Sequence, residues 1–237
     1  MTIDVGRFAT HVGLELIDGY QGFNDNYSRA MGFGYAGPFT HTGLRASIAL
    51  SDTISAMAMV ANGWDNSQDN NDGKTFGTQV SYAPESGALE MYLNYVGGPE
   101  QAGNSGNYRH LADLVTIVHP TQAWTISTDI TYGYEDDAVG GTSSSQWFAA
   151  SMINSVRICD LFGVALRGEY FDDNDGTQTG TAQKLWEVTL TPSLFLGDHA
   201  VVRADFRYDR SNQSTFTDNT GTSKNQMTVG LNSVFYF

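Results

Sequence analysis

Residues 200–209 read AVVRADFRYD, and this segment decides the class of fold. Apolar and aromatic residues occupy every even position, and from 203 onward charged residues fill the odd positions: Arg203, Asp205, Arg207 and Asp209. Such a period of two residues predicts a β-strand with one apolar and one charged face. A small dry core cannot solvate so many charges, so the charged face should meet water. The apolar face then needs either a hydrophobic core or lipid.

The same alternation recurs along the chain and predicts an all-β protein of about twelve strands. The strands are expected at 3–9, 39–50, 52–63, 74–83, 87–97, 107–119, 121–134, 145–158, 161–172, 182–196, 198–210 and 223–237. Two segments give an ambiguous pattern. Residues 53–63 carry an Ala-Met repeat, and in 107–119 apolar residues share the parity of Asp113.

The connections between these strands are alternately short and long. Short turns are expected at 51–52, 84–87, 120–121, 159–160 and 197–198, and long polar loops at 65–73, 98–106, 135–144, 173–181 and 211–222. This alternation and an even number of strands are typical of a transmembrane up-and-down β-barrel. Strands of about 10 residues or more also suit a tilted membrane crossing. A soluble β-sandwich or a lipocalin-like barrel is the alternative, since a sandwich could turn its polar face to water.

Composition narrows the classes of function. The chain has 237 residues with 12 basic and 26 acidic side chains, and its net charge of −14 argues against a nucleic-acid partner. The single cysteine, Cys159, excludes an intrachain disulfide and a cysteine-based zinc cluster. No basic segment followed by an apolar run marks a signal peptide at the start. We expect one barrel domain over residues 1–237.

The end of the chain supports the barrel interpretation. The final strand has apolar residues of one parity and ends on Phe237, which resembles the C-terminal signal of bacterial outer-membrane barrels.

Residues 10–38 contain no convincing strand but several apolar residues, too many for a freely solvated loop. Long loops inside a compact domain are often functional. We therefore expect 10–38 to fold back into the barrel as a constriction loop.

Short motifs in the first third of the chain resemble a known family. They are VGRF at 5–8, GLE at 13–15, NYSR at 26–29, PFTHTG at 38–43 and NGWD at 62–65. In this order they resemble the OmpL-like β-barrel porins, the porin-2 family. The resemblance implies an outer-membrane channel for small solutes with an inward-folded loop. Members are longer at the N-terminus, which leaves open whether early strands are missing here.

Solutes would diffuse through a water-filled lumen, so the relevant residues are those that line it. Six arginines have inward parity on the wall: Arg45, Arg109, Arg157, Arg167, Arg203 and Arg207. The loop offers three carboxylates and one cation: Glu15, Asp18, Asp25 and Arg29. One hypothesis is a constriction in which loop carboxylates face wall arginines and create a transverse field. The alternative is that these charges pair and stiffen the wall, as Glu169 beside Arg167 suggests.

Other functions find less support. The five histidines lie outside recognisable hydrolase motifs, and only His110, near an outer strand end, is kept as an enzymatic candidate. No paired metal-ligand spacing or cofactor motif is present. The acidic loops 65–73 and 172–176 lack EF-hand spacing, which favours solvated loops and leaves calcium binding there as an open alternative. Acidic outer loops should attract cations and give a weak cation preference. The expected partners are the outer-membrane bilayer and small hydrophilic solutes; a homo-oligomer, and a silent barrel acting as sheath, anchor or adhesin, are left open.

Overall fold

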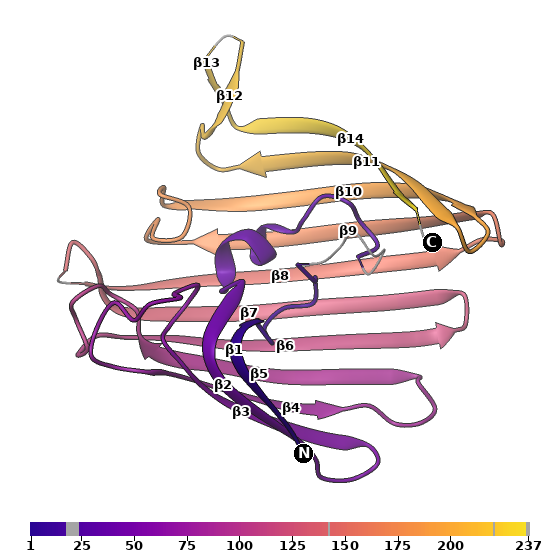
Figure 1. Ribbon diagram of the computed structural model, residues 1–237. Helices are drawn as coiled ribbons and strands as arrows, with labels where there is room; N and C mark the ends of the chain where they lie inside the picture. Colours follow the sequence, from indigo (N-terminus) through magenta and orange to yellow (C-terminus); the bar gives the residue numbers. More distant parts are fainter. Residues whose placement is uncertain (18–23, 142, 220, 236–237) are drawn as a thin grey trace.

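The computed structural model describes residues 1–17, 24–141, 143–219 and 221–235. Twelve strands form one antiparallel sheet in chain order, and the sheet curves into a barrel wall with β1 and β14 at its two ends (Figure 1). The strands are β1 Thr2–Ala9, β2 Thr40–Ala49, β3 Ile54–Ala61, β4 Thr75–Tyr82, β5 Leu89–Pro99, β6 Tyr108–Thr121, β7 Trp124–Val139, β8 Ser143–Arg157, β9 Phe162–Asp173, β10 Gln183–Leu196, β11 Ala200–Ser211 and β14 Asn225–Phe235. Among the described residues, no helix is long and apolar enough to cross a membrane.

All twelve predicted strands are confirmed, with small shifts at their ends. The largest difference concerns the predicted loop 135–144, where β7 continues to Val139 and β8 begins at Ser143. The pairing of β7 with β8 shifts register after Glu135 and resumes at Val139, opposite Ser143, so the two strands extend into the predicted loop. A small hairpin, β12 (Phe216–Asp218) and β13 (Gly221–Ser223), stands inside the predicted loop 211–222.

The sheet is apolar on its outside and polar on its inside, as the alternation predicts. Leu190 and Phe206, cross-strand partners on the outer face, are 43% and 50% exposed. Thr189 and Arg167, the partners of the inner face one position away, are fully buried. A water-soluble sandwich would place its apolar side chains the other way round. The exposed apolar face is the surface expected of a barrel that sits in lipid.

Aromatic residues lie on the outer face toward the ends of the strands. Seven aromatic side chains are exposed there: Tyr82, Tyr95, Trp124, Tyr132, Trp186, Tyr208 and Phe235. The terminal Phe237 lies outside the described residues. Rings with an apolar body and a polar edge are favoured at membrane–water boundaries, so the belt marks the two edges of the lipid-facing band.

The inner face carries a hydrophobic core, formed between the wall and the loop 10–38. The two ambiguous segments supply part of it, because Met57, Met59 and Leu111 point inward and pack against Val12 of the loop. Apolar residues on the inside therefore do not contradict a barrel; they mark where the loop rests. This contact explains why the parity of the segments 53–63 and 107–119 was ambiguous.

Trp147 on β8 forms the centre of a second inner cluster. It is 1% exposed, packs with Met31 and Ala36 of the loop, and donates a hydrogen bond from Nε1 to the carbonyl oxygen of Ala36 at 2.9 Å. Its cross-strand partner is Gly133, and a side chain there would collide with the indole ring. The contacts of this inward tryptophan assign it to anchoring the loop.

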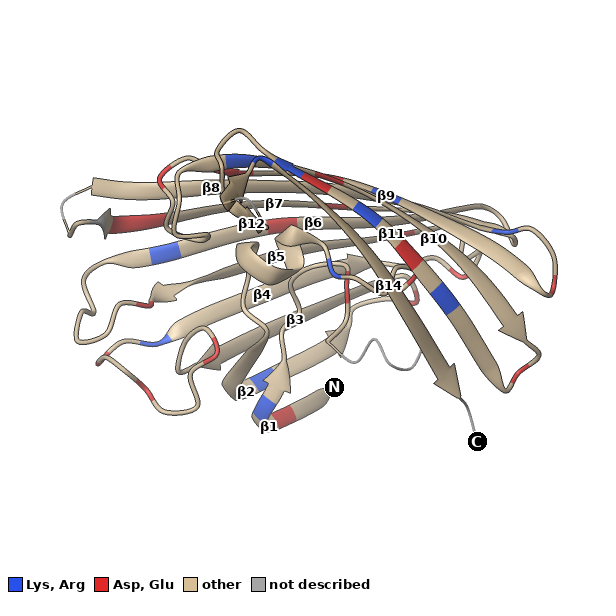
Figure 2. Cartoon of the chain, turned by 90° about the horizontal axis from the view of Figure 1, so that it is seen from above, with Lys and Arg blue, Asp and Glu red and all other residues tan. Residues whose placement is uncertain are grey.

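The short π-helix η2 (Gly32–Ala36) lies in this anchored part of the loop, packed against β7 and β8. It crosses in front of the strands in Figure 1 and stands near the middle of the concave side in Figure 2. The loop thus runs across the inside of the wall, which confirms the prediction that it folds inward.

Substituting Leu190 by Arg should destabilise the protein strongly. A cation on the lipid-facing side near mid-bilayer costs about 2–4 kcal/mol. The matched control is Gln226→Arg, which places the same side chain on the inner face opposite Asp209. Guanidinium unfolding in lipid vesicles should show a lower midpoint for the Leu190 variant only. Equal midpoints would contradict the assignment of the outer face.

Substituting Trp147 by Phe should keep most of the packing and remove the donor to Ala36. A buried carbonyl without its partner costs about 1–3 kcal/mol. We expect a lower unfolding midpoint and faster proteolysis within 10–38. Trp124→Phe, on the exposed outer face, is the control and should leave both unchanged. Unaltered proteolysis of the Trp147 variant would show that the indole does not hold the loop.

Candidate functional site

Carboxylates of the wall bind the backbone of the inward loop. Glu169 accepts hydrogen bonds from the amides of Met31 and Gly32, both at 2.6 Å. Asp205 accepts from the amide of Ser28 at 2.6 Å. Two further wall carboxylates bind the start of the loop: Asp113 holds Gly13 N at 3.2 Å and Asp129 holds Leu14 N at 2.9 Å. These hydrogen bonds to carboxylates take the place of the backbone hydrogen bonds that a neighbouring strand would provide.

Arginines of the wall bind the carbonyl groups of the same loop. Arg167 donates to Ser28 O at 2.6 Å, Arg207 to Arg29 O at 2.5 Å, and Arg203 to Asn24 O. Figure 2 shows the basic and acidic positions alternating along β11, the strand that carries two of these arginines. A loop of irregular backbone thereby finds donors and acceptors for both of its polar groups.

Arg167 also forms the most buried ion pairs of the wall. Its Nη1 lies 2.9 Å from Glu15 Oε1 of the loop, and its Nε lies 2.9 Å from Glu187 Oε2 of β10. The Arg167 and Glu187 side chains are fully buried, and that of Glu15 is 4% exposed. The loop carboxylate and the wall arginine do face each other, but in a dry cluster. Glu169 turns to loop amides, which sequence reasoning did not foresee.

The other predicted charges are distributed around the wall. Arg45 pairs with Asp4 at 2.9 Å, and Arg109 pairs with Glu135 at 2.7 Å. Arg157 sits at the short-turn end, where it donates to the carbonyls of Cys159 and Asp160. Arg207 pairs with Asp209 on its own strand. In the loop, Arg29 lies over the ring of Phe33. The structure therefore brings Glu15 to Arg167 and Asp25 near Arg203, and it places Arg45, Arg109 and Arg157 elsewhere on the wall.

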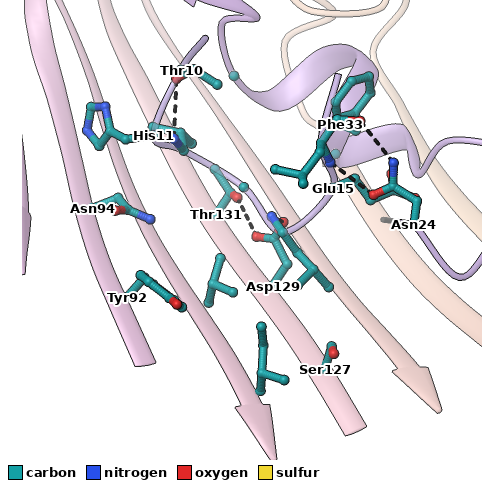
Figure 3. Close-up of a pocket in the computed structure, with 18 of the residues that line it drawn as sticks. Thr10, His11, Glu15, Asn24, Phe33, Tyr92, Asn94, Ser127, Asp129 and Thr131 are labelled. Atoms are coloured by element: carbon teal, nitrogen blue, oxygen red, sulfur yellow. Dashed lines mark hydrogen bonds between the residues drawn. The ribbon is translucent and has the colours of Figure 1, made fainter. Parts of the chain in front are cut away.

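The two remaining predicted carboxylates of the loop are Asp18 and Asp25. Asp18 lies outside the described residues. Asp25 is exposed and lines a cavity of about 610 Å³ between the loop and the inner face of the wall. We call this cavity the vestibule. Figure 3 shows Tyr92, Ser127 and Asp129 on its strands, with the loop crossing beside them.

The vestibule contains acidic, amide and apolar side chains. Its carboxylates are Glu15, Asp25, Glu90 and Asp129, and none of the described residues that line it is Lys or Arg. Sequence reasoning did not select Glu90 or Asp129 as site residues. Their inward parity on β5 and β7 could have identified both residues, but the prediction for the wall considered only the arginines.

The outer loops and His110 show no sign of a metal or catalytic centre within the described residues. No group of three or more His, Cys, Asp or Glu side chains is placed to hold a metal ion there. His110, on the outer face, stacks against Tyr108 and Tyr134 and hydrogen-bonds Tyr95. At the end of β5, burial raises the pKa of Glu100, which hydrogen bonds from Thr75 and Trp64 oppose.

Solved structures with the same fold are outer-membrane proteins. The channel DcaP of Acinetobacter baumannii has a TM-score of 0.71 and 11% identity, over 99% of this chain and 71% of that chain. The anion-selective porin from Comamonas acidovorans has a TM-score of 0.68 and 13% identity, over 98% and 70%. OmpT of Vibrio cholerae has a TM-score of 0.64 and 13% identity, over 98% and 74%. At these identities the likeness concerns the fold alone.

Comparison of sequences identifies the family. No curated protein sequence matches the chain significantly. The family described as "Putative beta-barrel porin-2, OmpL-like" matches residues 1–237, the whole chain, and so extends the resemblance seen in its first third. This family and the fold indicate a channel rather than an enzyme. The chain therefore belongs to the OmpL-like β-barrel porin-2 family and is a channel protein for small solutes in the bacterial outer membrane.

Proposed function

We propose that the protein conducts ions and small hydrophilic solutes by passive diffusion, with a weak preference for cations. The observation that carries this proposal is the charge of the vestibule. Carboxylates line it, while three inward arginines, Arg167, Arg203 and Arg207, donate to the backbone of the loop. A cation in the lumen would meet accessible negative charge, and an anion would find the matching positive charges already bound.

The preference should be weak because several of these carboxylates are also bound. Asp129 accepts the amide of Leu14, and Glu15 pairs with Arg167. Glu90 is the vestibule carboxylate with the most freedom to meet a solute, because it accepts only the hydroxyl of Tyr92 among the described residues. Asp25 is exposed but also interacts with Ser155 and Arg203, so its charge is partly compensated. Acidic residues in the long outer loops add to the negative field at the mouth.

The fold itself does not set the sign of selectivity. The Comamonas acidovorans porin is anion-selective and has the same fold with 13% identity. Selectivity depends on the side chains that line the lumen. An expectation of cation preference for this chain therefore rests on its own carboxylates and not on its structural relatives.

Planar-bilayer recordings under a salt gradient should show stepwise openings with a reversal potential on the cation-selective side. The preference should be stronger at 0.01 M salt than at 1 M, because the screening length shrinks from about 30 Å to about 3 Å. Substituting Asp25 by Asn removes one accessible charge and should move the reversal potential toward zero. Glu85→Gln, in an exposed turn outside the vestibule, is the matched control.

Two outcomes would contradict this proposal. An anion-selective reversal potential would refute the cation preference. A folded and inserted protein that remains silent would favour the alternative function, a barrel that serves as a sheath, anchor or adhesin for a partner.

Substituting Arg167 by Met tests whether this arginine acts on the loop or on the solute. The change leaves Glu15 and Glu187 buried without their counter-charge, and breaking such a pair costs about 3–5 kcal/mol. We expect a lower unfolding midpoint and noisier open-channel current as the loop loosens. Arg210→Met, an exposed arginine of β11, is the control. A stable variant with a quiet current and changed selectivity would instead assign Arg167 to the pore lining.

A further inference from the structure

The floor of the vestibule is built from two neighbouring rows of inward residues. Strand register places Glu90 on β5 opposite Ile117 on β6, then Ser127 on β7 and Ile153 on β8. The next row contains Tyr92, Val115 and Asp129. Residues directly across neighbouring strands share a face, so each row is a continuous strip of side chains.

These rows have an apolar centre with an acid on each side. Val115 and Ile117 on β6 occupy the middle, Ile153 lies further along the row on β8, and all three line the vestibule. Glu90 flanks them from β5 and Asp129 from β7. The two carboxylates stand two strands apart, which corresponds to about 10 Å at the usual spacing of strands.

The loop closes the vestibule from the other side with further apolar groups. Leu14, Ile17 and Phe33 of the loop line it together with the wall. Figure 3 shows Phe33 beside Glu15 and Asn24, on the opposite side of the view from Tyr92. A path meant only for hydrated inorganic ions gains nothing from such a lining, because apolar surface offers no replacement for their water.

Glu90 retains an oxygen that can receive a ligand. The hydroxyl of Tyr92 donates to Glu90 Oε2 at 2.6 Å, which fixes the carboxylate over the floor. No hydrogen bond to Glu90 Oε1 is found among the residues that the structure describes, and the side chain is half-buried. A partly desolvated carboxylate held in place is a good acceptor for a charged N–H donor.

We propose that the vestibule is a binding subsite for small organic ammonium compounds with an apolar body. The apolar part would lie over Val115 and Ile117, and the ammonium group would bind Glu90, with Asp129 on the opposite side. The volume of about 610 Å³ is ample for a compound the size of phenethylammonium. Organic anions are disfavoured because no Lys or Arg is among the described residues of the lining. This inference rests on the proposed function, since it names the solute class that the channel prefers.

The test uses the refolded full chain and three small probes. Phenethylammonium carries the ammonium group and the apolar body, ethanolammonium lacks the apolar body, and 3-phenylpropionate carries the opposite charge. Calorimetric titration in detergent measures binding without requiring an open channel. Block of the single-channel current in planar bilayers measures binding in the conducting state.

Phenethylammonium should bind and block more strongly than either other probe. Glu90→Gln should weaken its binding roughly tenfold, the order expected for one charge-assisted hydrogen bond. Ile117→Val should weaken it about fourfold, the factor for one buried methylene group, and leave ethanolammonium unchanged. Glu85→Gln, outside the vestibule, should bind phenethylammonium like the parent protein.

The outcomes separate this inference from the proposed function. Openings in KCl without binding or block by phenethylammonium would overturn the subsite and leave the channel proposal standing. Binding by calorimetry with loss in Glu90→Gln, in a protein that never opens, would support the subsite and refute the channel. Equal binding of 3-phenylpropionate, or unchanged binding in both vestibule variants, would overturn the assignment of the ligand class.

Discussion

A segment of irregular backbone inside a barrel must find partners for its amide and carbonyl groups, and this constraint organises the inner face. In a strand, the neighbouring strands supply those partners. Here charged side chains of the wall do so, with Glu169 and Asp205 accepting from loop amides and Arg167 donating to a loop carbonyl. Because a charged group makes a stronger hydrogen bond than a neutral one, a few side chains hold a long stretch of chain.

The same constraint divides the inner charges into two groups. Charges that contact the loop, such as Arg167 with Glu15, are dry and mutually neutralised, so their field in the lumen is weak. Charges that remain beside open space are carboxylates, among them Asp25 and Glu90. Counting inward charges along the strands overestimates the positive field, since parity tells which face a residue occupies and not what it touches.

Much of the fold could be predicted from the sequence, because period-two alternation and loop length are local properties. The strand β11 illustrates this: Arg203 and Phe206 lie on the faces that their parity requires. The anchors of the loop could not be predicted in the same way. Trp147 meets Ala36, and Arg167 meets Glu15, only when distant parts of the chain are brought together. Met57 and Leu111 point inward because they pack against Val12 of the loop. In the sequence, their apolar side chains on the polar face only make the alternation ambiguous.

The distance along the chain between the loop and its anchors has a consequence for how the molecule assembles. Glu15 and Arg167 are 152 positions apart, and Asn24 and Arg203 are 179 apart. Contacts between such remote positions form late, because the intervening chain must first be ordered. The loop comes early in the sequence, but it would therefore pack against the wall only after β9 and β11 have formed. Until then the lumen would remain unconstricted, and its narrowing by the loop would be the final event of folding.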